Sequence, residues 1–313
     1  MSSRKNLSIK SNVVIPIAQR LRLIADDMGN FSLDSVISSD LLSRSLPNDF
    51  VQIFFKKRIH VISDKKKTHV ATELNLENDK VTPDSNAKLA VYHEICDGMV
   101  KNNTLSKYLY NALQSLESMY AFRKRFAAQW AIESLLQYAF NVVDRTPSRL
   151  VINIDTGQVV PTEFRISYNN QGLIEGNKLP FRFTRNIENL IGPFMIGGIF
   201  VPAMASGAEA FHSVNEELNP ALCVILRDDI VSWYCSKSPP RSDSKNQELE
   251  RQLGERILKN ASLVQRRMLE CAPDTDMDTD KQDAADSHLR HLLHVATSPE
   301  NLCEAPLPFQ PWF

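Results

Sequence analysis

The chain has 313 residues, of which 43% are hydrophobic and 23% charged, and its net charge is −1. This length accommodates one large domain or two smaller ones, with the composition of an ordinary globular protein. The near-neutral charge excludes a global electrostatic basis for nucleic-acid binding. Five cysteines without CxxC spacing favour reduced thiols in the cytosol or nucleus over a zinc ribbon or a disulfide framework.

The N-terminal third alternates between extended and helical patterns. Residues 7–17 predict a strand that leads into a linker. From Phe31 to Leu46 the apolar residues recur at helical spacing, and Pro47 ends the pattern. Residues 47–87 are mixed and carry two basic clusters, at 56–58 and 65–67. We interpret these clusters as a solvated loop; a nuclear-import or phosphate-binding patch is the alternative.

Helical patterns follow densely. One helix is expected over 88–100, and Thr104 is predicted to cap the next. A long helix is predicted over 120–143, with Phe122, Phe126 and Trp130 on one face. Such a stripe of aromatic residues is more typical of a core than of a ligand site.

A β-hairpin is the clearest local signal. Two β-branched runs, 150–154 and 158–161, flank a turn at Asp155-Thr156-Gly157. A polar loop, 144–149, precedes the hairpin, and residues 162–165 follow it. The pattern therefore predicts two loops brought together by a hairpin.

The stretch 189–208 has 20 residues without a charge, which is long enough to cross a membrane. It contains Pro193, Pro202 and the pair Gly197-Gly198. These residues favour a buried helix with breaks over a membrane span, which stays as the alternative of a membrane-associated protein.

The C-terminal third begins with a helical pattern over 220–234 and then changes composition. An amphipathic helix is predicted over 247–269. The aspartate-rich run 274–286 lacks the glycine and glutamate of an EF-hand loop, so we interpret it as a disordered acidic linker. We interpret His288, His291 and His294 as one face of a short helix rather than as metal ligands.

The two loops and the hairpin resemble the catalytic centre of the phosphatidylinositol-3-kinase-related kinases. That family has Asp-Arg-His-x-x-Asn in the catalytic loop, Asp-Phe-Gly after the hairpin and Pro-Phe-Arg-Leu-Thr after the activation loop. The catalytic Asp and Arg fall on Asp144 and Arg145, and residues 180–184 match except for Phe183. The other matched positions differ from the family pattern, except for the phenylalanine at 164: they are Thr146 for His, Arg149 for Asn, Glu163 for Asp and Arg165 for Gly.

These differences imply a pseudokinase rather than an enzyme. Magnesium prefers oxygen ligands, whereas Arg149 places a cation where the resemblance puts a ligand. We therefore expect no catalytic, cofactor-binding or metal-binding residue and no cofactor. Asp144 is expected to accept from backbone amides of its loop or to pair with Arg149, and Arg145 is expected to pair with Glu163, joining the two loops without a metal.

Two further stretches resemble this superfamily. Residues 226–233 resemble the last kinase-lobe helix of the transformation/transcription domain-associated protein family (TRRAP), and 296–303 with the final Pro-Trp-Phe resemble its closing FATC segment. The resemblance implies an α+β, mainly α fold: a kinase-like C-lobe with a small β-hairpin, followed by a C-terminal FATC helical segment. We expect Leu302, Trp312 and Phe313 to fold back onto the lobe.

The resemblance divides the chain into an N-lobe strand and hinge remnant (1–27), a pseudokinase C-lobe (28–235), an amphipathic helix with an acidic linker (236–286) and FATC (287–313). No glycine-rich loop or strand lysine precedes the lobe, so a C-terminal fragment of a larger protein or a truncated gene model is expected.

The implied function is a nuclear, non-catalytic scaffold and coactivator subunit of SAGA-type and related histone acetyltransferase complexes. Its expected partners are the other complex subunits and DNA-bound activators, without direct nucleic-acid or membrane binding. An active serine/threonine kinase is the alternative.

Overall fold

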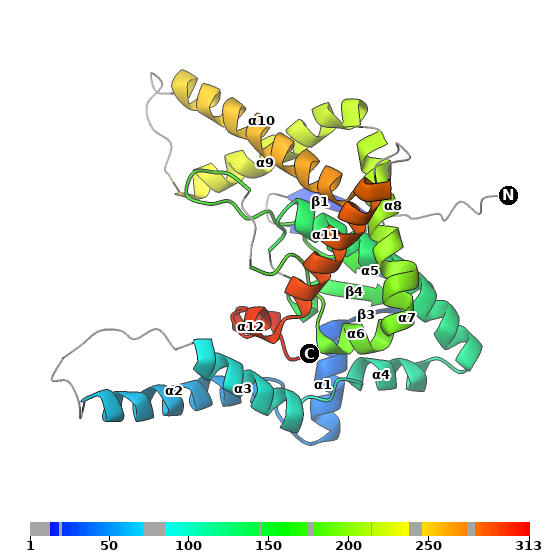
Figure 1. Cartoon of the computed structure of the whole chain (residues 1–313), viewed down its shortest axis with the longest axis vertical. Helices are drawn as coiled ribbons and strands as arrows, with labels where there is room; N and C mark the ends of the chain where they lie inside the picture. Colours follow the sequence, from blue (N-terminus) through cyan, green and yellow to red (C-terminus); the bar gives the residue numbers. More distant parts are fainter. Residues whose placement is uncertain are drawn as a thin grey trace.

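A computed structural model describes residues 13–18, 21–71, 85–143, 145–174, 178–213, 215–237, 246–273 and 279–313. The fold is mainly helical, with helices packed around a small sheet (Figure 1), which confirms the predicted fold class. The α-helices are α1 (Leu33–Ser43), α2 (Phe50–Ala71), α3 (Ser85–Gly98), α4 (Thr104–Ala112), α5 (Leu116–Ala139), α6 (Arg185–Ile191), α7 (Pro193–Met195), α8 (Val201–Ser213), α9 (Asn215–Lys237), α10 (Asn246–Cys271), α11 (Thr279–Thr297) and α12 (Pro299–Leu302). The described residues also include the 3₁₀ turns η1 (Pro147–Arg149) and η4 (Leu307–Phe309) and the π-helical turn η2 (Ile196–Phe200).

The predicted hairpin supplies the central strand and one edge strand of a three-stranded antiparallel sheet. Strands β4 (Leu150–Asn153) and β5 (Val159–Pro161) pair through Val151 and Val160, and β3 (Asn30–Ser32) pairs with the other edge of β4. Gly157 turns the chain with φ = 67°, and a Cβ there would lie 3.1 Å from main-chain atoms of α5. Glycine is required at this turn because it tolerates both the positive φ and the close approach.

Residues near the N-terminus of the chain form a second, two-stranded sheet. Strands β1 (Val14–Ala18) and β2 (Leu21–Ile24) pair antiparallel, with a register shift between Pro16 and Ala18. Residues 7–12 of the predicted strand lie outside the described residues, while its last part forms β1, which continues into a hairpin with β2. The large apolar side chains described on both strands are exposed.

The helix predicted over 31–46 begins later than expected. Phe31 lies in β3 opposite Ile152, and Ser32 caps α1 by accepting a hydrogen bond from Ser35 N at 3.1 Å. The apolar side chain of Phe31 fits both a helical and a strand pattern, and pairing with β4 decides between them.

The cap predicted at Thr104 is wrong. The hydroxyl of Thr104 donates to Lys101 O at 3.1 Å, and Asn186 of α6 accepts the hydrogen bond from Leu105 N, also at 3.1 Å. A residue distant in sequence therefore satisfies the free amide at this helix start. The aromatic stripe of α5 is core, as predicted: Phe122, Phe126 and Trp130 are buried.

The basic clusters at 56–58 and 65–67 fall within α2, which corrects their interpretation as a loop. Helices α2 and α3 pack against each other and project from the lower part of the molecule (Figure 1). Lys56, Lys57 and Arg58 are exposed, and Arg58 reaches Glu94 of α3 at 2.9 Å. Solvation of the first cluster is compatible with a helix because one helix face remains open to water.

The uncharged stretch around 189–208 is interrupted as predicted. Gly192, with φ = 76°, separates α6 from α7, and the Gly197-Gly198 pair lies in η2. Helix α8 packs against α5, α10 and α11, yet Phe194 is exposed, so burial is confined to part of the stretch. Among the described residues, one helical stretch, Pro193–Ser213, is long and apolar enough to cross a bilayer by length and composition.

The amphipathic helix predicted over 247–269 corresponds to α10, which packs against α9 as a long helical pair (Figure 1). Of the aspartate-rich run, residues 274–278 lie outside the described residues. The remainder belongs to α11, so Asp280, Asp283 and Asp286 are helical rather than part of a disordered linker. Helix α11 continues across the expected boundary at 286/287 to Thr297.

Candidate functional site

The loop that precedes β4 and the loop that follows β5 lie side by side because the hairpin joins them. The carbonyl of Arg149 accepts hydrogen bonds from Thr162 N at 3.0 Å and from the Thr162 hydroxyl at 3.2 Å. The guanidinium of Arg149 also forms an ion pair with the carboxylate of Glu163. These contacts place the two positions matched to metal ligands in direct contact with each other.

The expected pair between Arg145 and Glu163 is wrong: the cation that joins the two loops is Arg149. Arg145 points elsewhere and donates from Nη2 to Leu179 O at 3.0 Å. Its guanidinium lies 6.0 Å from the ring centre of Phe309. Asp144 lies outside the described residues, so its expected partners stay a prediction.

Burial shapes the chemistry of Arg145. The residue is 9% exposed, and its Nη1 has no hydrogen-bond partner among the residues that the structure describes. Removal of water disfavours the charged form, which lowers the pKa of Arg145 to about 10. The side chain stays a cation at neutral pH, although burial opposes its charge.

The residues matched to the family's Asp-Phe-Gly continue along one side of the lobe. Phe164 is partly exposed and packs edge to face on Phe140, with ring centres 5.2 Å apart. The carbonyl of Arg165 accepts from Val143 N at 2.9 Å, which fixes this loop to the segment that follows α5. Burial raises the pKa of Asp229 in α9. The hydrogen bond with Tyr168 and the positive charge of Arg165 act in the opposite direction but are smaller.

Arg182 is a structural residue to which the sequence interpretation assigned no role. It lies in the run Pro-Phe-Arg-Phe-Thr, residues 180–184, which resembles the family pattern, and it is fully buried. Helix α5 holds its main chain: Gln137 Oε1 accepts from Arg182 N at 3.0 Å, and Trp130 Nε1 donates to Arg182 O at 3.0 Å. The signal in the sequence was the position of Arg182 between two phenylalanines, which predicts a buried side chain. A buried arginine in turn requires hydrogen-bond acceptors.

Those acceptors are main-chain oxygens of the C-terminal segment, residues 299–313. Arg182 donates to Phe309 O, to Gln310 O at 3.4 Å and to Phe313 O at 3.0 Å. It also donates to Arg145 O at 3.2 Å, and its guanidinium stacks 4.5 Å from the ring centre of Phe309. Burial, reinforced by the nearby charge of Arg145, lowers the pKa of Arg182 to about 9.

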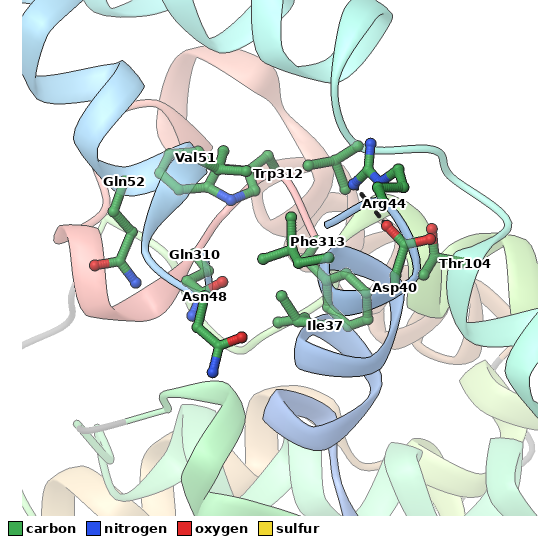
Figure 2. A pocket seen from close by; sticks show the side chains of 12 residues that line it. Ile37, Asp40, Arg44, Asn48, Val51, Gln52, Thr104, Gln310, Trp312 and Phe313 are labelled. Atoms are coloured by element: carbon green, nitrogen blue, oxygen red, sulfur yellow. Dashed lines mark hydrogen bonds and ion pairs between the residues drawn. The ribbon is translucent and has the colours of Figure 1, made fainter. Parts of the chain in front are cut away.

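The C-terminal segment folds back onto the lobe, as predicted. Leu302, Trp312 and Phe313 are all buried. Figure 2 shows Trp312 beside Val51 of α2 and Phe313 beside Ile37 of α1, where both line one small pocket. The ring of Trp312 also packs on Phe55, with centres 5.4 Å apart.

Two cavities flank the first loop where the C-terminal segment crosses it. The larger, which we call the loop cavity, has a volume of about 390 Å³. It is lined by Val143, Arg145, Thr146, Lys178, Leu179, Asn301, Glu304, Ala305, Pro306, Pro308 and Phe309. The second, of about 370 Å³, is lined by Asp34, Gln52, Thr146, Pro147, Ser148, Arg149, Pro308 and Gln310.

The three histidines on α11 lie apart from these loops. His288 Nε2 is 3.3 Å from the Tyr138 hydroxyl and 4.0 Å from Glu270 Oε2. Burial lowers the pKa of His288, while Glu270 acts in the opposite direction. In the described part of the chain, no group of three or more His, Cys, Asp or Glu side chains is arranged to hold a metal ion.

Comparison with known proteins places these observations in a family. The profile of the phosphatidylinositol 3- and 4-kinases matches residues 23–235. The SAGA complex/NuA4 acetyltransferase complex subunit TRA1 of Saccharomyces cerevisiae is 23% identical over 99% of the chain, which spans 8% of that relative. The transformation/transcription domain-associated protein of Mus musculus is 21% identical over 99% of the chain, which spans 12% of its length.

The fold is similar to a solved structure titled FAT and kinase domain of CtTel1. That structure superposes with a TM-score of 0.66 at 16% identity and covers 98% of this chain and 19% of its own. The chain is thus much shorter than the proteins it matches. Since the family profile covers more than half of the chain and the kinase-domain fold is present, this protein belongs to the phosphatidylinositol 3- and 4-kinase family.

Proposed function

We propose that the chain is the kinase-like part of a non-catalytic scaffold subunit of SAGA-type and related histone acetyltransferase complexes. The observation that carries this proposal is the similarity to TRA1, an acetyltransferase complex subunit, over 99% of the chain. The mouse relative, named for transformation and transcription, supports the same role. We place the protein in the nucleus as a transcription coactivator, because histone acetyltransferase complexes act on chromatin.

The contact between the two loops supports a non-catalytic role. Phosphoryl transfer depends on magnesium ions held between the loops by oxygen ligands. The carboxylate of Glu163 is instead paired with Arg149, so a magnesium ion would have to displace a guanidinium that stays charged at neutral pH. This donor set does not fit magnesium, and we assign no catalytic, cofactor or metal residue.

The proposed partners are proteins: subunits of the acetyltransferase complex and DNA-bound activators. A net charge of −1 supports docking on proteins rather than on nucleic acid directly. The packing of α8 against α5, α10 and α11 supports a helix with a role in the lobe rather than in a membrane.

Affinity purification tests complex membership. The full-length protein that carries this chain would be tagged at its own locus, and the co-purifying histone acetyltransferase activity measured. We expect activity in the wild type and in Arg266→Met, an exposed change on α10, but reduced recovery with Arg182→Met, which detaches the C-terminal segment. Absence of acetyltransferase activity from the wild-type purification would contradict the proposal.

An active kinase is the second candidate, and the fold similarity to a structure that contains a kinase domain favours keeping it. Magnesium-dependent ATP binding and phosphotransfer would be measured on the full-length protein, with Asp144→Ala as the control. We expect no transfer, and none after Arg149→Asn alone, because the remaining differences persist. Transfer that Asp144→Ala abolishes would replace the scaffold proposal with an enzyme.

A further inference from the structure

A cavity between α4, α5 and α6 shares no lining residue with the two loops or the C-terminal segment. We call it the α4–α6 cavity, because these two helices lie side by side (Figure 1) and both contribute to its lining. Its volume of about 380 Å³ is in the range of sites that hold a small ligand or an inserted side chain. The scaffold role proposed above assigns nothing to this cavity.

The lining contains two cations, Lys107 and Arg123, and none of its described residues is Asp or Glu. Lys107 of α4 is exposed, and its side chain makes no hydrogen bond or ion pair with the residues that the structure describes. The carboxylates nearest to the lining in sequence, Glu117 and Glu188, are not part of it. The positive charge of the lining is therefore not balanced within the cavity.

Arg123 of α5 is held in place by the end of α6. Its Nε donates to Leu190 O at 2.6 Å, and its Nη2 donates to Ile191 O at 3.0 Å. These carbonyls occupy one edge of the guanidinium, whereas Nη1 makes no hydrogen bond within the described part of the chain. The position of this donor is thus fixed before a ligand binds, which lowers the entropic cost of binding.

Amide and hydroxyl groups accompany the two cations. The Ser106 hydroxyl donates to Asn189 Oδ1 at 2.9 Å, which leaves Asn189 Nδ2 as a donor on the other side of the amide. Asn103 and Tyr110 also line the cavity, and their side chains have no hydrogen-bond partner among the described residues. Donors from three helices therefore line one cavity.

The number and kind of these donors select the anion. A phosphate monoester carries about −1.5 to −2 charges at neutral pH and offers three acceptor oxygens, which match two cations and the additional amide donors. A carboxylate has less charge and fewer oxygens. An inositol polyphosphate or a nucleic-acid backbone needs more cations than this lining contains.

Apolar side chains beside the cavity indicate what carries the phosphate. Met119 lines the cavity, and Leu116, on the same side of α5 one helical turn earlier, is 78% exposed. Tyr110 of α4 is 49% exposed. Exposed apolar side chains beside a polar cavity favour a protein segment, whose neighbouring residues cover them, over a free phosphate.

We propose that the α4–α6 cavity binds a phosphorylated serine or threonine of a partner protein, in a segment with an apolar residue next to the phosphorylated one. The phosphate accepts from Lys107 Nζ, Arg123 Nη1 and Asn189 Nδ2, and the apolar residue packs on Leu116 and Tyr110. Binding at this site then depends on phosphorylation of the partner. The proposal goes beyond the scaffold role, because the site is separate from the loops and contacts discussed above.

The test uses a fluorescein-labelled peptide in which phosphoserine is flanked by Leu and Ser, with matched peptides that carry Ser or Glu in its place. Binding to the purified full-length protein that carries this chain would be followed by fluorescence anisotropy. The phosphopeptide is expected to bind about tenfold more tightly than either matched peptide. Lys107→Glu should weaken its binding about tenfold, because one attraction is lost and one repulsion is added. Lys107→Arg should retain most of the binding.

Two further variants complete the test. Asn189→Asp keeps the acceptor for the Ser106 hydroxyl but replaces the Nδ2 donor with a carboxylate oxygen, so it should weaken phosphopeptide binding and leave binding of the Ser peptide unchanged. Lys124→Glu, an exposed change on α5 outside the lining, is the matched control and should have no effect. Lys107 and Asn189 are both exposed, so their variants are expected to melt like the wild type. If one of them does not fold, the other carries the test.

Three results would overturn the proposal: equal binding of the phosphoserine and Glu peptides, equal effects of Lys107→Glu and Lys124→Glu, or binding of phenyl phosphate as tight as that of the phosphopeptide. The last result would assign the cavity to a free phosphate ester instead of a protein segment. Acetyltransferase activity co-purifying with Lys107→Glu is expected to match the wild type. Failure of phosphopeptide binding with complex membership intact is thus distinct from failure of the scaffold role.

Discussion

Two arginines hold two regions of this molecule together in different ways. Arg149 joins the two loops that flank the β4–β5 hairpin by a salt bridge to Glu163, and the two side chains are 38% and 33% exposed. Arg182 is fully buried and joins the lobe to the C-terminal segment through main-chain oxygens. Water screens the exposed Arg149–Glu163 pair but does not reach the buried contacts of Arg182. Breaking the contacts of Arg182 should therefore cost more stability than breaking the exposed pair.

The contacts of Arg182 also explain why the C-terminal segment packs as part of the lobe. Its main-chain oxygens are the acceptors that a buried guanidinium needs, and Arg182 is the donor that these buried oxygens need. Neither side of the contact is satisfied alone. Arg149 and Glu163 do not depend on each other in this way, because water can hydrogen-bond to both side chains when they separate.

The largest effect is expected from Arg182→Met. The change removes the donor from four main-chain oxygens, those of Arg145, Phe309, Gln310 and Phe313. We expect a loss of about 3–5 kcal/mol in the free energy of unfolding, because several buried oxygens lose their donor and each unsatisfied buried acceptor costs about 1–3 kcal/mol. Urea unfolding followed by tryptophan fluorescence measures it, with the exposed Arg266→Met as control. Equal urea midpoints for Arg182→Met and Arg266→Met would show that the contacts of Arg182 do not stabilise the folded chain.

Trp312→Ala is expected to have the next largest effect. The indole is 1% exposed and packs on Phe55. A cavity of this size costs about 3 kcal/mol, at the lower end for large aromatic residues because the chain end relaxes into it. Differential scanning calorimetry measures the shift, and Trp312→Phe should recover most of the stability. An unchanged melting temperature would mean that the C-terminal segment contributes no packing energy.

Breaking the ion pair between Arg149 and Glu163 should change the free energy of unfolding much less. A double-mutant cycle with Arg149→Gln and Glu163→Gln is expected to show a coupling of about 0.2–1 kcal/mol, as for other exposed ion pairs. The coupling should decrease in high salt because solvent ions screen exposed charges. A coupling energy larger than the loss of stability in Arg182→Met would contradict the expectation that the exposed ion pair matters less than the buried contacts.

The smallest effect is expected from His288, which connects α11 to α5 near Tyr138. Burial holds the pKa of His288 below its usual value, so the folded state binds this proton less readily than the unfolded state. Its contribution to stability is present above the unfolded pKa and is lost as pH falls through the folded pKa. Unfolding curves at neutral and mildly acidic pH should differ less in His288→Asn than in the wild type; parallel behaviour would exclude the titration of this residue.

Local patterns in the sequence predicted much of the fold. The hairpin of β4 and β5, the aromatic core of α5 and the amphipathic α10 follow from strand alternation, turn residues and helical spacing. The burial of Trp312 and Phe313 was predictable as well, because large apolar side chains leave water wherever the chain allows. The amino-acid sequence thus determined the β4–β5 hairpin, the helices with strong apolar periodicity and the burial of the aromatic side chains, but not the helical state of the charged runs in α2 and α11.

Only the tertiary structure decided which polar groups meet. The sequence analysis paired Arg145 with Glu163 and Arg149 with Asp144, whereas packing of the first loop placed Arg149 against Glu163 and turned Arg145 toward Leu179. The same holds for Asn186, which caps α4 in place of Thr104. Hydrogen bonds and ion pairs act over a few ångströms between residues far apart in the chain, so their partners depend on how the elements pack rather than on local spacing.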